Sequence, residues 1–240
     1  MSQKFVVQDL VISITAKNLN PTVVNPDLLK YTGVVPTEWE LAREPIYTKR
    51  AVQVAFNNGV NIIAEPSGVM FAEPLVNKSV ESILVSSIAQ KYAQTLPNME
   101  FNAVGINLRG YISFDGSQEL AGRYISEKLL APGAWQEEGM RASLNLVYNY
   151  ERAPLYLNIT EAVLQENDET TTPIVMFSGR FNYKLIGEDA KEKLSRLRQA
   201  LENLQDDLKL YSELINNKFL EQAVSDRIAV PKIFAMTPAV

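Results

Sequence analysis

The stretch AVQVAF (51–56), NNG (57–59), VNIIAE (60–65), PSG (66–68) and VMFAE (69–73) decides the fold. Three short runs rich in Val, Ile and Phe alternate with two turns, whose Asn and Gly residues supply the positive φ angles that tight hairpins need. Strands that are joined by such short turns run antiparallel. The stretch therefore predicts a three-stranded antiparallel meander.

The segments on either side of this meander alternate between strand and helix patterns. Strand patterns occupy residues 5–17, 101–114, 142–150, 155–164 and 174–186, and long helical patterns occupy 79–96 and 187–223. Strand, short helix, three strands and long helix thus occur in that order twice. We expect an α+β fold whose antiparallel sheet is built from two pseudo-repeated β-α-β-β-β-α halves.

These halves are expected to span residues 1–97 and 98–225 of one continuous domain, followed by an irregular tail at 226–240. The order of elements resembles that of the TATA-binding protein family, whose saddle-shaped fold also duplicates a unit of strands and helices. The resemblance implies a curved sheet, and it makes nucleic-acid binding one alternative function. That function would require a concave face rich in Lys and Arg.

The composition excludes several kinds of chemistry. The 240 residues contain no cysteine and no histidine, so disulfides, thiol nucleophiles, imidazole bases and soft-metal sites are ruled out. The sequence contains no motif of a phosphate-binding loop, a dinucleotide site or a serine nucleophile. The acidic residues Glu166, Asp168 and Glu169 lack the glycine and the distal glutamate of a calcium loop. Carboxylate chemistry and oxygen-ligated Mg²⁺ or Ca²⁺ remain open, but no motif supports them, so we favour a non-catalytic protein without a cofactor or a metal.

The net charge and the hydropathy of the chain argue against nucleic-acid binding, membrane spanning and secretion. The formal net charge of −5 argues against nucleic acid as a partner. No apolar run reaches the roughly 20 residues that cross a bilayer. Residues 1–10 also lack the continuous apolar segment of a secretory signal. We expect a cytoplasmic protein that does not bind membranes.

The long C-terminal helical pattern carries a heptad seam, in which apolar residues recur at alternating intervals of three and four. The seam runs from Ala190 to Ile215, and its candidate interface residues are Leu194, Leu197, Leu201, Leu204, Leu208 and Tyr211. In one interpretation the seam is an interface, either in a homodimer or with a partner's helix. In the other, it packs on the chain's own sheet or against the helix at 79–96.

Two arginines interrupt apolar strand patterns, Arg109 beside Gly110 and Arg180 beside Gly179. Each could contact a small ligand in a concavity, or could lie on the polar face of a half-exposed strand. Together these patterns favour a non-catalytic protein-binding or assembly protein that acts through helix-mediated contacts, with a homodimer as one form. A nucleic-acid-binding saddle and a small-ligand-binding domain are the alternatives.

Overall fold

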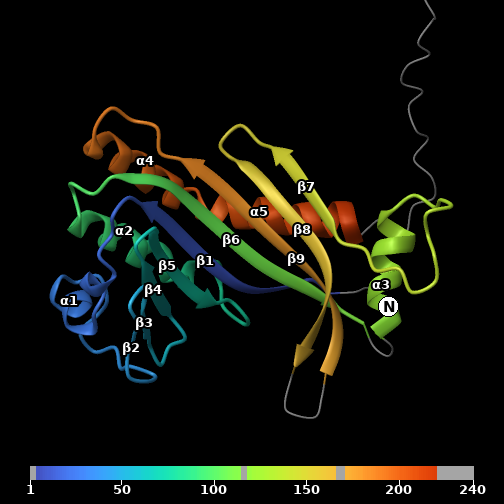
Figure 1. Ribbon diagram of the computed structural model, residues 1–240, viewed down its shortest axis with the longest axis horizontal. Helices are drawn as coiled ribbons and strands as arrows, with labels where there is room; N and C mark the ends of the chain where they lie inside the picture. Colours follow the sequence, from blue (N-terminus) through green and yellow to red (C-terminus); the bar gives the residue numbers. More distant parts are fainter. Residues whose placement is uncertain (1–3, 115–117, 166–170, 221–240) are drawn as a thin grey trace, which may run out of the picture.

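The strands of the protein form one antiparallel sheet in the order β2-β3-β4-β5-β1-β6-β9-β8-β7 (Figure 1). The computed structural model describes residues 4–114, 118–165 and 171–220. Within them the strands are β1 (Val6–Ala16), β2 (Ile46–Tyr47), β3 (Val52–Ala55), β4 (Asn61–Glu65), β5 (Gly68–Pro74), β6 (Phe101–Ser113), β7 (Leu144–Asn149), β8 (Pro154–Gln165) and β9 (Thr171–Lys184).

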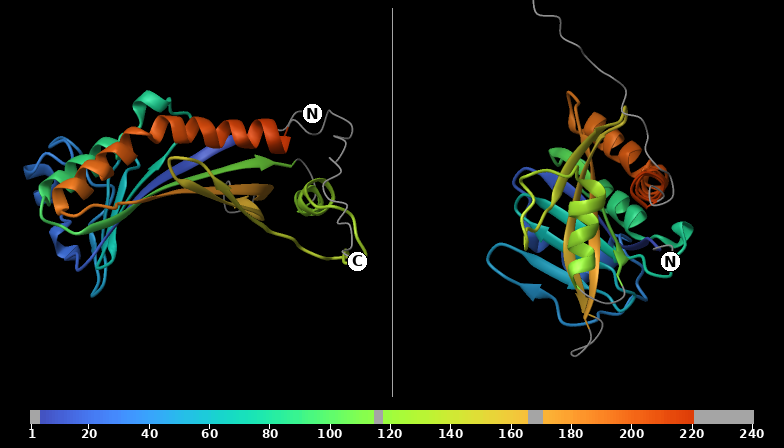
Figure 2. Two further views of the ribbon diagram at one scale, coloured as in Figure 1. Left: turned by 90° about the horizontal axis from the view of Figure 1, so that it is seen from above. Right: turned by 90° about the vertical axis from the view of Figure 1, so that its right-hand side faces the viewer.

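The helices lie against one face of this sheet. They are α1 (Pro26–Tyr31), α2 (Val85–Thr95), α3 (Gln118–Arg123), α4 (Ala190–Glu202) and α5 (Leu204–Ile215), with the short turns η1 (Pro21–Val23) and η2 (Val80–Ser82) and the π-helical segments η3 (Tyr124–Leu129) and η4 (Asn216–Leu220). Helix α2 packs on β1, β5 and α4, whereas α4 and α5 pack on β6 and α3 packs on β8 and β9. The two ends of the sheet bend away from the long helices, so the helix-free face lies inside the bend (Figure 2).

The predicted α+β class, with one antiparallel sheet and a long final helical region, is confirmed. The meander is also confirmed, because β3 pairs with β4 and β4 pairs with β5. Gly59 lies in the turn between β3 and β4 with φ at +88°, which is the left-handed region that glycine adopts easily. No described helix combines the length and apolar character of a membrane-spanning segment.

The long C-terminal helix differs from the expected single run. Asp189 caps its start by accepting a hydrogen bond from the backbone N–H of Glu192 at 2.7 Å. Asn203 then separates α4 from α5, so the seam is divided between two helices. The described helical region ends at Leu220. The expected continuation to residue 223, the tail at 226–240 and the acidic residues Glu166, Asp168 and Glu169 lie outside the described residues.

One hydrophobic core fills the space between the sheet and its helices. The period-two pattern of β1 shows how it forms, because Leu10, Ile12 and Ile14 are buried while the residues between them remain partly exposed. A buried carboxylate also takes part: Glu73 in β5 accepts hydrogen bonds from the backbone N–H groups of Leu84 at 2.8 Å and Val85 at 3.0 Å. Glu73 thereby caps the start of α2 and fixes that helix to the sheet.

Candidate functional site

The heptad seam is packed within the chain. Leu197, Leu201, Leu204, Leu208 and Tyr211 are buried, and Leu194 is partly buried. Helix α4 contacts α2 and β6, and Ser86 of α2 donates a hydrogen bond to the carbonyl oxygen of Leu201 at 3.3 Å. A partner at the seam would therefore have to displace the chain's own helix and sheet.

Tyr211 shows how firmly the seam is joined to the sheet. Its hydroxyl donates to the carbonyl oxygen of Phe177 at 2.6 Å, and burial raises its pKa. A methyl group at Gly179 would lie 2.7 Å from the Tyr211 ring. Gly179 therefore makes room for this ring, and a packing requirement explains the glycine beside Arg180.

The two arginines singled out by the sequence come together on the helix-free face. Arg109 on β6 pairs with Ser178 on β9, which places Arg180 diagonally beside it. Arg109 forms a bidentate ion pair with Asp9 on β1, from Nε to Oδ1 at 2.9 Å and from Nη2 to Oδ2 at 2.8 Å. These hydrogen bonds raise the pKa of the Arg109 guanidinium. Arg180 is exposed, and its guanidinium forms no hydrogen bond or ion pair within the described part of the chain.

Arg180 belongs to a row of residues that crosses several strands of this face. Val147 on β7 pairs with Tyr156 on β8, and Tyr156 pairs with Arg180. Val147 is 55% exposed and Tyr156 is 45% exposed. We call these three side chains the sheet-face patch. Asn107 continues the row on β6, where its amide donates to the carbonyl oxygen of Val11 at 2.8 Å.

Near the patch the helix-free face is mainly polar and nearly balanced in charge, whereas the partly exposed apolar side chains of Val11, Ile63 and Met70 lie further along it. The alternation of side chains along the strands places on it the cations Arg109, Arg180 and Lys184 and the anions Asp9 and Glu65. The remaining polar positions are mainly amides and hydroxyls, among them Ser13, Thr15, Gln53, Asn61, Asn145, Asn149, Asn158, Thr160, Ser178 and Asn182. The excess of Lys and Arg that a nucleic-acid saddle needs does not occur on these described strands.

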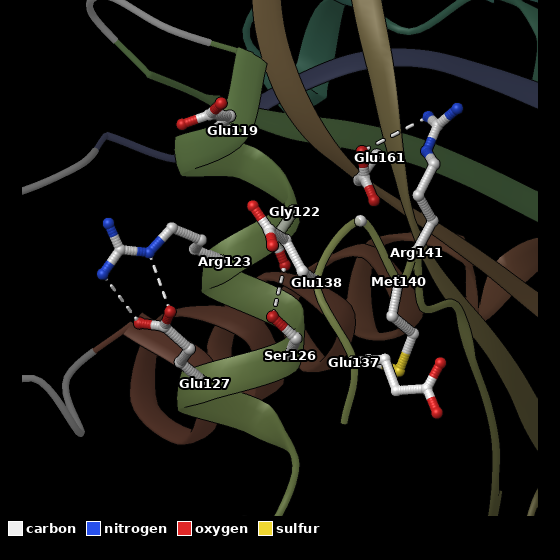
Figure 3. Close-up of a pocket in the computed structure, with 11 residues that line it drawn as sticks. Glu119, Gly122, Arg123, Ser126, Glu127, Glu137, Glu138, Met140, Arg141 and Glu161 are labelled. Carbon is white, nitrogen blue, oxygen red and sulfur yellow. Dashed lines mark hydrogen bonds and ion pairs between the residues drawn. The ribbon is translucent and has the colours of Figure 1, made fainter. Parts of the chain in front are cut away.

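A separate cavity of about 700 Å³ lies at the α3 end of the molecule (Figure 3). Helix α3, η3, the loop before β7 and strand β8 form its walls. Its lining includes five glutamates and two arginines: Glu119, Glu127, Glu137, Glu138, Glu161, Arg123 and Arg141. No sequence pattern predicts this cavity, because its residues come from three separate segments of the chain.

Two of the glutamates that line this cavity form ion pairs with its two arginines. Arg123 binds Glu127 at 2.7 Å, and Arg141 binds Glu161 at 3.3 Å. Among the described residues no group of three carboxylates could hold a metal ion. The cavity is therefore a polar surface hollow with acidic walls, and its geometry does not define a catalytic arrangement.

A buried carboxylate lies where the turn between β7 and β8 meets α5. Asp207 is 1% exposed. It accepts hydrogen bonds from the hydroxyl of Tyr183 at 2.6 Å and from Arg152 at 3.3 Å. Burial raises the pKa of Asp207 to about 6. Because Arg152 also binds Asp206 at 2.8 Å, this group fastens the β7–β8 hairpin to the helix.

Val147 and Tyr156 are not among the site residues predicted from the sequence. The signal was present, because each is an apolar or aromatic residue at a position whose neighbours on the same face are amides: Asn145 and Asn149 beside Val147, and Asn158 beside Tyr156. Comparison with known proteins adds no candidate function, since no protein-family model, no curated protein and no solved structure matches the chain.

Proposed function

We propose that the protein is a non-catalytic protein-binding protein and that its partner binds the helix-free face of the sheet at the sheet-face patch. The proposal replaces the helix seam as the contact surface, because the seam side chains are covered within the chain. We further propose that the protein acts in the cytoplasm. Disulfides are rare in that compartment, and this chain contains no cysteine.

The observation that carries the proposal is the alignment of two exposed apolar side chains with an exposed arginine. Val147, Tyr156 and Arg180 are consecutive cross-strand neighbours. Tyr and Arg are the residue types enriched where single side chains contribute most to protein–protein binding. A surrounding face of amides and hydroxyls with balanced charge is typical of the polar rim of such an interface.

We infer that the two predicted halves of the chain each supply one side of the bent face. Strands β1 and β6 are neighbours at its centre, with β5 and β4 beyond β1 and with β9 and β8 beyond β6. A nucleic-acid ligand is the weaker alternative, because three cations and two anions on this face give little attraction for phosphates.

Site-specific photo-crosslinking in living cells tests the proposal. Tyr156 is replaced by the photoreactive residue p-benzoylphenylalanine, which keeps the para-substituted phenyl ring and replaces the hydroxyl with a larger benzoyl group. The matched control carries the same residue at Tyr31, which is 90% exposed and lies on α1, far from β7 and β8 (Figure 1). We expect a discrete protein adduct at position 156 that is absent at position 31, and Arg180→Ala should reduce its yield.

Two results would overturn the proposal. An adduct at position 156 that nuclease removes would identify nucleic acid as the ligand. Equal adduct patterns at positions 156 and 31 would show that crosslinking at the sheet-face patch is as nonspecific as at any exposed position.

A further inference from the structure

Strand β7 leaves one edge of the sheet open. It is the last strand in the sheet order, and no described strand pairs with its outer side. Its six residues, LNLVYN (144–149), contain no proline and no charge. An edge strand presents unpaired backbone N–H and C=O groups, and natural proteins usually protect such edges with charges, prolines, bulges or short strands.

The opposite edge of the same sheet is protected in this way. Strand β2 has only two residues, Ile46 and Tyr47. Pro45 precedes it, and Lys49 and Arg50 follow closely. The β2 edge is thus protected against pairing with another strand and the β7 edge is not. The unprotected edge lies beside the sheet-face patch.

We propose that β7 pairs antiparallel with β7 of a second copy of the chain, with Val147 of the two copies opposite each other on a two-fold axis. Two sheets would then continue across the axis as one. The proposal does not rest on the proposed function, because the edge could pair whether or not a partner occupies the helix-free face.

The choice of a second copy follows from how well β7 matches itself. In this register Asn145 lies opposite Asn149 of the second copy, and Leu146 lies opposite Tyr148, so amides meet amides and apolar side chains meet apolar side chains. Moving the axis to Leu146 would instead place Asn145 opposite Val147. The register centred on Val147 therefore gives the better match.

The charges that flank β7 also fit this register. Glu151 would face Ser143, and Arg152 would face Ala142, so no pair of like charges meets. On the helix-covered side, Leu144, Leu146 and Tyr148 are only partly buried against the core. A second copy would cover these side chains further.

The two-fold axis brings two copies of the sheet-face patch next to each other, because Val147 belongs to both the edge and the patch. Pairing of six residues buries much less than the roughly 1,200–2,000 Å² of a standard interface. We therefore expect weak, concentration-dependent association of the full chain.

Cysteine crosslinking tests the register directly, since the natural chain contains no cysteine. Under mild oxidation Val147→Cys should form a disulfide-linked dimer, because directly opposed Cβ atoms approach the separation that a disulfide requires. Asn145→Cys alone should stay monomeric, whereas an equimolar mixture of Asn145→Cys and Asn149→Cys should crosslink. Tyr31→Cys is the control for random collisions.

Sedimentation velocity of the cysteine-free chain provides a second measurement. We expect Val147→Lys to weaken association at least tenfold, because it places two like charges on the axis, while far-ultraviolet circular dichroism stays unchanged. Asn145→Lys, which would face an amide, should have a smaller effect. The proposal is wrong if Val147→Cys crosslinks no faster than Tyr31→Cys, if Asn145→Cys crosslinks alone, or if the natural chain stays monomeric at the highest concentration attained.

Discussion

The buried carboxylate of Glu73 should be one of the most costly side chains in the molecule to remove. It is 1% exposed, and besides the N–H groups of Leu84 and Val85 it binds the ammonium group of Lys78 at 2.8 Å. The change Glu73→Ala leaves both backbone donors without an acceptor at the start of α2. Lys78 is partly exposed, so water can solvate its charge after the change.

The expected magnitude follows from these contacts. Each buried donor that loses its acceptor costs about 1–3 kcal/mol. The hydrogen bond of Val85 is buried and that of Leu84 is partly buried. Together they give a loss of about 1–5 kcal/mol in the free energy of unfolding, against the 5–15 kcal/mol typical of a natural domain. Glu73→Gln keeps a carbonyl oxygen as an acceptor and should lose less.

Urea denaturation followed by circular dichroism measures this loss. Glu65→Ala is the matched control, because Glu65 is an exposed glutamate at the end of the neighbouring strand β4, and its removal should change stability by no more than about 0.5 kcal/mol. If Glu73→Ala costs less than about 1 kcal/mol, or no more than Glu65→Ala, then the carboxylate does not hold α2 and the reasoning fails.

Three further changes test other parts of the structure. Because the pKa of Asp207 is raised from 3.8 to about 6, the folded state binds the proton more tightly, so the stability of wild type relative to Asp207→Asn should fall by up to about 3 kcal/mol as pH rises from 4 to 6. Urea titrations across this range check it, and a stability difference that stays constant with pH would contradict it. Gly179→Ala should lower the melting temperature, at a cost of about 1–3 kcal/mol, since the added methyl group meets the Tyr211 ring. Tyr92→Phe should preserve or raise stability by about 1 kcal/mol in the same denaturation assay, because the buried Tyr92 hydroxyl has no hydrogen-bond partner among the described residues; a loss above 1 kcal/mol would contradict this.

The parts of the fold that were predicted correctly depend on local sequence. Alternating burial and turn residues define β3, β4 and β5, because a period of two and an Asn-Gly turn lie within about twenty consecutive residues. The helix at 187–223 was also recognised from its period. Its break at Asn203 was not, since an asparagine inside a helical pattern has only a modest effect on propensity.

The parts that were missed depend on contacts between distant residues. A heptad pattern shows that a helix has an apolar stripe, but it does not show whether α2 or another molecule covers Leu201. Likewise, the role of Glu73 depends on N–H groups that lie eleven and twelve residues further along the chain. The exposure of Tyr156 follows from the packing of the helices on the other face of the sheet, and within the sequence of β8 only the amide of Asn158 on the same face indicates it.

The central position of β1 and β6 has a consequence for how the chain reaches its structure. Asn107 binds the carbonyl oxygen of Val11 across 96 positions of sequence, and Asp9 pairs with Pro74 of β5. During synthesis β1 therefore emerges before either of its neighbours exists, while the β3–β5 meander can close at once. Because distant strand pairings form slowly, β1 spends the longest time as an apolar segment without neighbouring strands.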